Sequence, residues 1–109
     1  MQTMNTSQLK LLLEGSGGKL ALINTLPEAA FPATKIPDSE NVPLEDENFE
    51  QRVEEIADGK IQPVVVYSAN EECDASTRAA EKLTAAGFTD VWDYQGGAQA
   101  WKEAEQESA

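Results

Sequence analysis

The chain of 109 residues contains no histidine and a single cysteine. Without an imidazole, a Ser–His or Cys–His nucleophile pair cannot form, and zinc sites built from histidines or from several thiolates are excluded. A single cysteine also excludes an internal disulfide. Most hydrolase mechanisms are therefore ruled out, and we expect neither a bound metal nor a cofactor.

Basic residues are scarce too. Eight Lys and Arg stand against 20 Asp and Glu, which gives a net charge of −12. Binding to nucleic acids or to anionic membrane surfaces needs a basic face, so we expect neither partner. The composition is that of a soluble acidic protein, and it equally suits a host with high internal salt.

Long apolar runs are also missing. A membrane-spanning helix needs about 20 consecutive apolar residues, and the longest run here is a handful. The first six residues lack the basic start and apolar stretch of a secretory signal. The sequence predicts a cytoplasmic protein with one domain over residues 1–109, and it gives no indication of the oligomeric state.

Segments with helical and strand patterns alternate along the chain. Helices are predicted over residues 6–14, 49–58, 74–86 and 98–106, and strands over residues 20–23, 63–67 and 91–94, with a short strand at most at 41–42. Prolines make residues 31–43 irregular, Gly96-Gly97 predicts a turn with positive φ, and residues 105–109 are expected to fray. Such alternation predicts an α/β fold with a parallel sheet that is covered on both faces.

One combination of motifs is specific. Ala86-Gly87-Phe88-x-x-Val91 is followed by Gly96-Gly97-x-x-x-Trp101, after a strand at residues 64–67 and an Ile36-Pro37 pair further upstream. Over about residues 18–104 the chain resembles a rhodanese-like (sulfurtransferase) domain. The resemblance implies a single three-layer domain whose central, mostly parallel sheet of about five strands has helices on both faces.

The resemblance also implies a site. In that family, the residue directly after the central strand is a cysteine that carries a sulfane sulfur atom as a persulfide, and loop amides and the next helix stabilise the anion. The aligned residue here is Ser68, which begins a loop of seven residues: Ser68, Ala69, Asn70, Glu71, Glu72, Cys73 and Asp74.

An oxygen cannot form a persulfide, and a hydroxyl without a paired base has no accessible anion near neutral pH. The resemblance therefore implies a rhodanese-like domain without ordinary thiosulfate sulfurtransferase activity. A natural serine and an engineered cysteine-to-serine change look the same in one sequence.

Other positions also depart from the family pattern. The family often carries an aspartate and an arginine after the first strand and a histidine before the Ile-Pro pair, where this chain has Asn24, Leu26 and Lys35. The loop itself is acidic and is opposed only by Arg78. Anionic donors such as thiosulfate would therefore meet charge of their own sign.

Cys73 is an alternative thiol, five residues after Ser68 and beside the start of a helix. It is either a redox-active or sulfur-carrying group, or a small packed residue left from a lost pair. Two functions follow: a binding or regulatory role at the old anion pocket, toward a protein or a small thiol or sulfur compound, or an active sulfurtransferase or thiol redox enzyme that works through Cys73. A phosphatase would need a cysteine at position 68 and an arginine closing the loop, and Arg78 lies too far along the chain.

Overall fold

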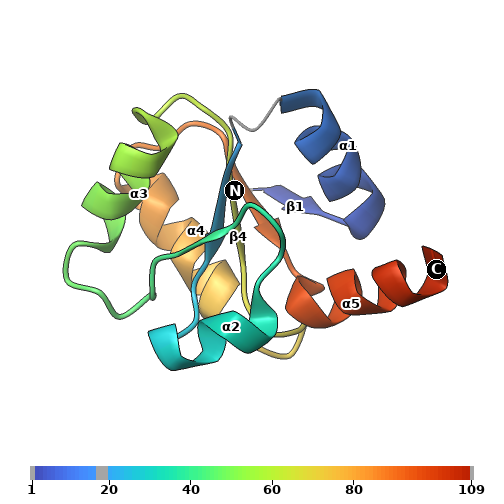
Figure 1. Ribbon diagram of the computed structural model, residues 1–109. Helices are drawn as coiled ribbons and strands as arrows, with labels where there is room; N and C mark the ends of the chain where they lie inside the picture. Colours follow the sequence, from blue (N-terminus) through green and yellow to red (C-terminus); the bar gives the residue numbers. More distant parts are fainter. Residues whose placement is uncertain (1, 17–19, 109) are drawn as a thin grey trace.

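The computed structural model describes residues 2–16 and 20–108 and shows a three-layer α/β fold (Figure 1). Short loops connect successive elements. In chain order they are β1 (Gln2–Met4), α1 (Thr6–Ser16), β2 (Ala21–Asn24), the 3-10 helix η1 (Glu28–Ala30), α2 (Phe31–Thr34), β3 (Glu40–Asn41), α3 (Phe49–Ala57), β4 (Val64–Tyr67), α4 (Ala75–Ala85), β5 (Val91–Tyr94) and α5 (Gly97–Ser108).

The five strands form one sheet in the order β1-β5-β4-β2-β3, and every described pairing is parallel. Helices α3 and α4 cover one face of the sheet, and α1 and α5 cover the other (Figure 1). The predicted fold class is thus confirmed. No helix in the described part of the chain is both long enough and apolar enough to cross a lipid bilayer.

The core lies on both faces of the sheet, because a parallel sheet between two helix layers buries both sides of its strands. In β4, Val64 and Val66 pack toward α3 and α4, while Val65 and Tyr67 pack toward α1 and α5. Burying one such apolar side chain stabilises the fold by about 1.5–3 kcal/mol. This burial fixes the orientation of β4 and therefore the place where its loop begins.

Three of the segments that differ from the sequence prediction have a clear physical reason. Strand β1 was not predicted, because only Met4 of its three residues is buried and the strand is defined by its pairing with β5. Residues Phe31–Thr34, expected to be irregular, form α2, since Pro32 lies in the first turn, where no helical N–H bond is lost. Helix α5 continues to Ser108, beyond the predicted end and through most of the segment expected to fray, while Ala109 is outside the described residues.

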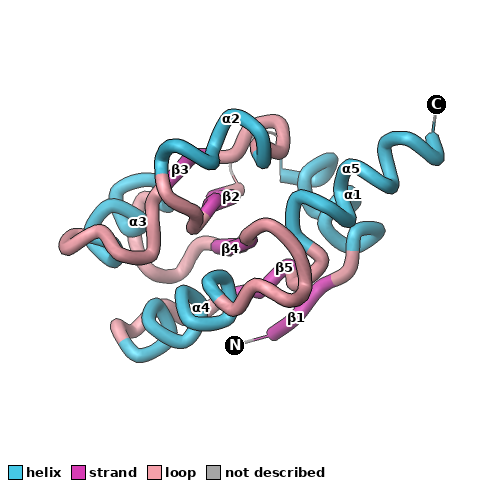
Figure 2. Tube along the Cα trace, turned by 90° about the horizontal axis from the view of Figure 1, so that it is seen from below, coloured by secondary structure: helices cyan, strands magenta, loops and turns pink. Residues whose placement is uncertain are grey.

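The carboxyl ends of the strands meet at one edge of the molecule. Figure 2 shows this edge, where the loop from β4 to α4 lies close to the start of α5, with α2 at the end of β2. Loops at this edge of an open α/β sheet commonly hold the functional groups. The residues predicted from the sequence as a site, 68–74, lie in this loop.

Candidate functional site

Ser68 is the first residue after β4, and its backbone is held by α5. The carbonyl of Ser68 accepts a hydrogen bond from the N–H of Ala98 at 2.9 Å, and the carbonyl of Ala69 accepts one from Gln99 at 2.9 Å. These N–H groups belong to the first turn of α5 and have no acceptor within the helix. The loop thus begins from a fixed position.

Gly97 makes this close approach possible. Its φ is +64°, and a Cβ atom at this position would lie 2.4 Å from the carbonyl oxygen of Ser68. Glycine adopts positive φ without strain and leaves room for the loop backbone. The positive φ predicted at the Gly-Gly turn is confirmed at Gly97.

Asn70 organises the middle of the loop. Its side-chain oxygen accepts the N–H of Glu72 at 3.0 Å and the N–H of Cys73 at 3.2 Å. The carbonyl of Asn70 accepts the N–H of Cys73 as well, at 3.2 Å. Two loop amides are therefore directed at Asn70 and not at the hydroxyl of Ser68.

The Ser68 side chain is buried, with 1% of its surface exposed. Its hydroxyl oxygen lies 3.4 Å from the carbonyl oxygen of Cys73 and 3.5 Å from the hydroxyl of Ser76, both long contacts, and its single proton can be donated to only one partner at a time. Neither partner is a base that could remove its proton near neutral pH. The hydroxyl therefore has a structural role and no means of activation among these contacts.

Cys73 is a free, half-buried thiol near the end of this loop. Burial raises the pKa of the thiol, but hydrogen bonds from the N–H of Ala75, the hydroxyl of Ser68 and the N–H of Ala69 lower it, and the net pKa lies below the ordinary value even with Asp74 close by. A lowered pKa increases the thiolate fraction, which is the nucleophilic form. The structure thus brings Ser68 and Cys73 together.

The thiol lies in a hollow of about 420 Å³ with an acidic wall. The carboxylates come from the loop, and the rest of the wall comes from α4 and the residue after β5. The lining residues are Glu71, Glu72, Cys73, Asp74, Ser76, Thr77 and Gln95. Arg78, the one basic residue expected to oppose these carboxylates, is exposed and does not line the hollow.

One buried residue beside the hollow was not anticipated from the sequence. Asp93 of β5 is completely buried, and its Oδ2 accepts a hydrogen bond from the hydroxyl of Thr77 at 2.8 Å. Its Oδ1 has no partner among the described residues. An acidic residue in the middle of a buried strand is the signal that could have identified it.

The sequence model of the rhodanese-like domain family matches residues 5–104. The chain belongs to the rhodanese-like family. A comparison with curated proteins gave no match. The match extends the resemblance to include α1, whose Leu9 is completely buried under the sheet.

Solved structures share the fold of this rhodanese-like domain at low sequence identity. A protein of Bacillus halodurans superposes with a TM-score of 0.80 at 19% identity, over 95% of this chain and 73% of its own. The rhodanese-like domain of an Anabaena protein gives 0.78 at 24% identity, over 95% and 75% of the two chains. The human single-domain sulfurtransferase gives 0.72 at 17% identity, over 94% and 96%.

Asn24, Leu26 and Lys35, the three residues that depart from the family pattern, make their contacts elsewhere in this rhodanese-like domain. Asn24 is completely buried and donates to the hydroxyl of Tyr67 at 3.1 Å, while its side-chain oxygen accepts the N–H of Leu26 at 3.0 Å. Lys35 is exposed, with its ammonium group 5.7 Å from the centre of the Phe31 ring. None of the three lines the hollow beside Cys73.

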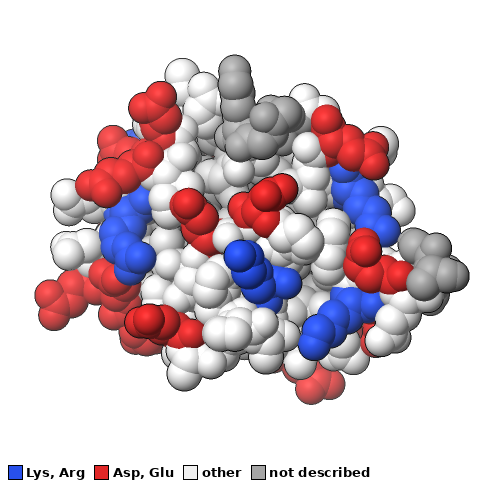
Figure 3. Space-filling view, viewed as in Figure 1, with Lys and Arg blue, Asp and Glu red and all other residues white. Residues whose placement is uncertain are grey.

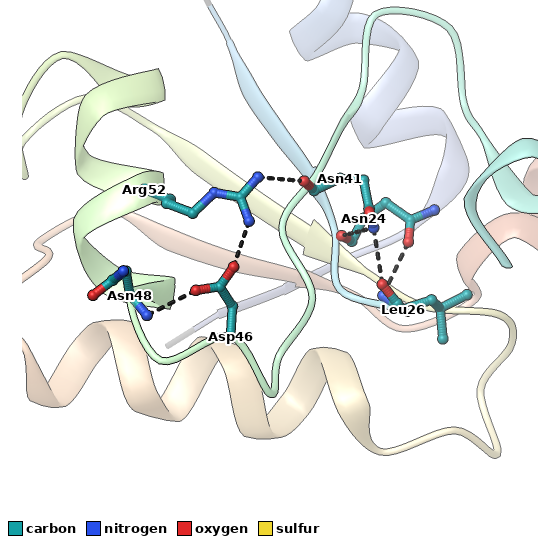
Figure 4. Close-up of polar contacts among 6 residues, drawn as sticks. All are labelled: Asn24, Leu26, Asn41, Asp46, Asn48 and Arg52. Carbon is teal, nitrogen blue, oxygen red and sulfur yellow. Dashed lines mark hydrogen bonds and ion pairs between the residues drawn. The ribbon is translucent and has the colours of Figure 1, made fainter. Parts of the chain in front are cut away.

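The turn after β2 is tied to β3 and α3 (Figure 4). The side-chain amide of Asn41 donates to the carbonyl of Leu26 at 2.8 Å, and Arg52 donates to the carbonyl of Asn41 at 3.3 Å and pairs with Asp46. The guanidinium of Arg52 is therefore used within the fold. No group of three or more potential ligand side chains among the described residues could hold a metal ion.

Proposed function

We propose that this rhodanese-like domain lacks ordinary thiosulfate sulfurtransferase activity and serves as a binding or regulatory module at the loop of residues 68–74. The observation that carries the proposal is the arrangement around Ser68. A buried hydroxyl occupies the position after the central strand, and the amides of Glu72 and Cys73 are bound to Asn70. Neither a sulfur carrier nor those two donors are available at position 68 for an anionic intermediate.

The acidic wall of the hollow favours some ligands over others. Thiosulfate would approach Glu71, Glu72 and Asp74 against charge repulsion, whereas a neutral or cationic group would not. The ligand class that fits is a protein segment or a small thiol or sulfur compound without excess negative charge. The cytoplasm remains the proposed location, and a free thiol suits a reducing compartment.

An activity assay tests the proposal. The purified domain is incubated with thiosulfate and cyanide, and separately with a small persulfide and an acceptor thiol, with an active rhodanese as the positive control. We expect no turnover above the uncatalysed rate, and no change on Ser68→Ala. Turnover that Ser68→Ala abolishes would contradict the proposal.

The geometry around Cys73 favours a second candidate function, a thiol that accepts sulfur. Despite its burial, the thiol has a lowered pKa because of the hydrogen bonds from Ala75, Ser68 and Ala69. Its thiolate would attack the outer sulfur of a persulfide donor, forming a new S–S bond as the donor's S–S bond breaks. The electron pair of that bond leaves with the donor as a thiolate, and Cys73 becomes the persulfide.

Intact mass spectrometry distinguishes the second candidate. After incubation with a small neutral persulfide, the second candidate predicts the mass of one added sulfur atom, absent in Cys73→Ser and retained in Ser68→Ala. A thiol that gains no sulfur and also fails to react with small alkylating reagents would eliminate this candidate and leave the first.

A further inference from the structure

A groove follows the edge of the sheet at β3, which β2 separates from β4 and its loop. It consists of two adjoining hollows of about 680 and 690 Å³ that share Glu40, Glu55 and Ile56. The first reaches Leu20, just before β2, and the second reaches Phe31 of α2. We call these joined hollows the β3 groove.

The floor of the β3 groove is partly apolar. Leu20, Phe31, Pro43 and Ile56 line it, and each is only partly buried. Burial of apolar surface is the main non-directional source of binding free energy, so this floor can contribute to affinity. The two hollows bring these four side chains to one edge of the sheet.

The rim of the β3 groove is acidic. It carries six carboxylates, those of Glu28, Asp38, Glu40, Asp46, Glu55 and Asp58, against one guanidinium, that of Arg52. Arg52 is bound to Asp46 and to the carbonyl of Asn41 (Figure 4), and the other five carboxylates make no ion pair with a described residue. Figure 3, viewed as Figure 1, shows more carboxylate than basic side chains on the visible face of the molecule.

Addition of a new strand to the sheet is hindered at β3. This strand has only two residues, Pro43 lies two positions after its end and has no N–H donor, and Arg52 covers the carbonyl of Asn41. Short edge strands, prolines and covering side chains are ways in which edges are protected from pairing with another chain. A partner in the β3 groove would therefore be recognised through its side chains.

We propose that the β3 groove binds an extended segment of a partner protein in which basic and apolar side chains alternate. In an extended chain such side chains point to opposite sides, so apolar groups can meet the floor while lysines or arginines reach the rim. The charge of the rim is complementary to such a segment, which provides selectivity and faster association. This site is independent of the loop of residues 68–74.

The test uses a short capped peptide of alternating lysine and leucine, with a central proline that prevents self-pairing. Amide chemical shifts of the labelled domain are followed during titration. We expect saturable shifts at Leu20, Glu40, Glu55 and Ile56. The double variant Glu40→Gln/Glu55→Gln should weaken binding about threefold to tenfold, as expected for the loss of two exposed charge pairs.

The matched control is Glu54→Gln/Glu81→Gln, which removes the same charge from exposed residues that do not line the groove. It should bind the peptide as the unmodified domain does, and thermal unfolding checks that both variants are folded. A peptide with serine in place of leucine should bind more weakly.

Three results would overturn the proposal: equal weakening by both double variants, the same shifts with spermine as with the peptide, or shifts spread over the whole acidic surface. Shifts confined to residues 68–74 would also overturn it and would support the binding module proposed for that loop. Shifts at the groove, with no shift in residues 68–74 and no reaction of Cys73, would support the proposal for the β3 groove. The same result would leave the function proposed for the loop without support.

Discussion

At the scale of single residues, Ser68 and Cys73 have complementary positions in one loop. Ser68 is the residue that follows β4, and its hydroxyl and carbonyl are both used for contacts that hold the loop. Cys73 carries the thiol of this loop, and hydrogen-bond donors are directed at its sulfur atom. Any thiol chemistry in this chain therefore depends on Cys73, with Ser68 as a positioning residue.

The pH dependence of alkylation should reveal this relation. Burial opposes ionisation of the Cys73 thiol, but the donors of Ala75, Ser68 and Ala69 outweigh it and lower its pKa. We therefore expect iodoacetamide, a neutral reagent, to react with a midpoint at lower pH in the folded domain than in the same protein unfolded in urea. Ser68→Ala removes one donor and should move the midpoint to higher pH.

Ser76→Ala is the matched control for this experiment. The hydroxyl of Ser76 lies 3.5 Å from the hydroxyl of Ser68, but it is not among the groups that lower the pKa of Cys73. Its substitution should move the midpoint less than Ser68→Ala does. Equal midpoints in the folded domain and in Ser68→Ala would show that the hydroxyl does not stabilise the thiolate.

At the scale of elements, the sequence indicated most of the helices and strands and the place of the loop. The apolar run before Ser68 and the alanines of α4 have strong patterns, because burial on both faces of a parallel sheet leaves few alternatives. Strand β1 has no such pattern, since it is defined by a neighbour 90 residues away in the chain, as its Gln2–Trp92 pairing shows. Pairing between distant segments is not visible in local spacing.

Within the site, the proximity of Ser68 and Cys73 followed from their spacing in one loop. The role of Asn70 did not, because the direction of the Glu72 and Cys73 amides depends on backbone angles that residue types alone do not determine. The burial of Asp93 also needed the structure, since it depends on α4 lying over β5 with Thr77 toward the strand.

The contact between α5 and the loop gives a stability prediction. Gly97→Ala would place an L residue at a φ of +64° and a Cβ atom 2.4 Å from the carbonyl oxygen of Ser68. The left-handed conformation alone costs about 1–2 kcal/mol, and relief of the clash must shift the backbone, so we expect a loss of about 2–4 kcal/mol in the free energy of unfolding. Urea unfolding measures it.

Gly15→Ala provides the comparison. Gly15 lies in α1, and a Cβ atom there would meet nothing within 4 Å. Because alanine is the better helix former by about 1 kcal/mol, this variant should be as stable as the original domain or slightly more so. If Gly97→Ala unfolded at the same urea concentration as Gly15→Ala, the close contact between α5 and the loop would not contribute to stability.

At the scale of the whole molecule, the charge is high for the size. A net charge of −12 is carried by a chain whose Cα radius of gyration is 12.6 Å. The three ion pairs among the described residues all involve partly exposed side chains, and such pairs contribute about 0–1 kcal/mol each. Repulsion between carboxylates should therefore exceed the attraction within the ion pairs, and salt screens both.

The melting temperature should consequently rise with sodium chloride at constant neutral pH. The screening length falls from about 30 Å at 0.01 M to about 10 Å at 0.1 M, so most of the gain should come below roughly 0.2 M. Calorimetry or circular dichroism at several salt concentrations measures it. A flat or falling melting temperature in this range would mean that attractive pairs balance the repulsion.

The behaviour above 0.2 M then separates the two interpretations of the composition. Above this concentration the screening length shrinks toward about 3 Å at 1 M, which is shorter than the distances between surface carboxylates. The repulsion between them is therefore almost fully screened. A plateau is the result expected for an ordinary soluble acidic protein. A melting temperature that keeps rising toward molar concentrations of sodium chloride would indicate adaptation to high internal salt, provided that it rises more steeply than for a neutral domain of similar size. The neutral domain is the control because the general effect of salt on apolar burial is shared by both proteins.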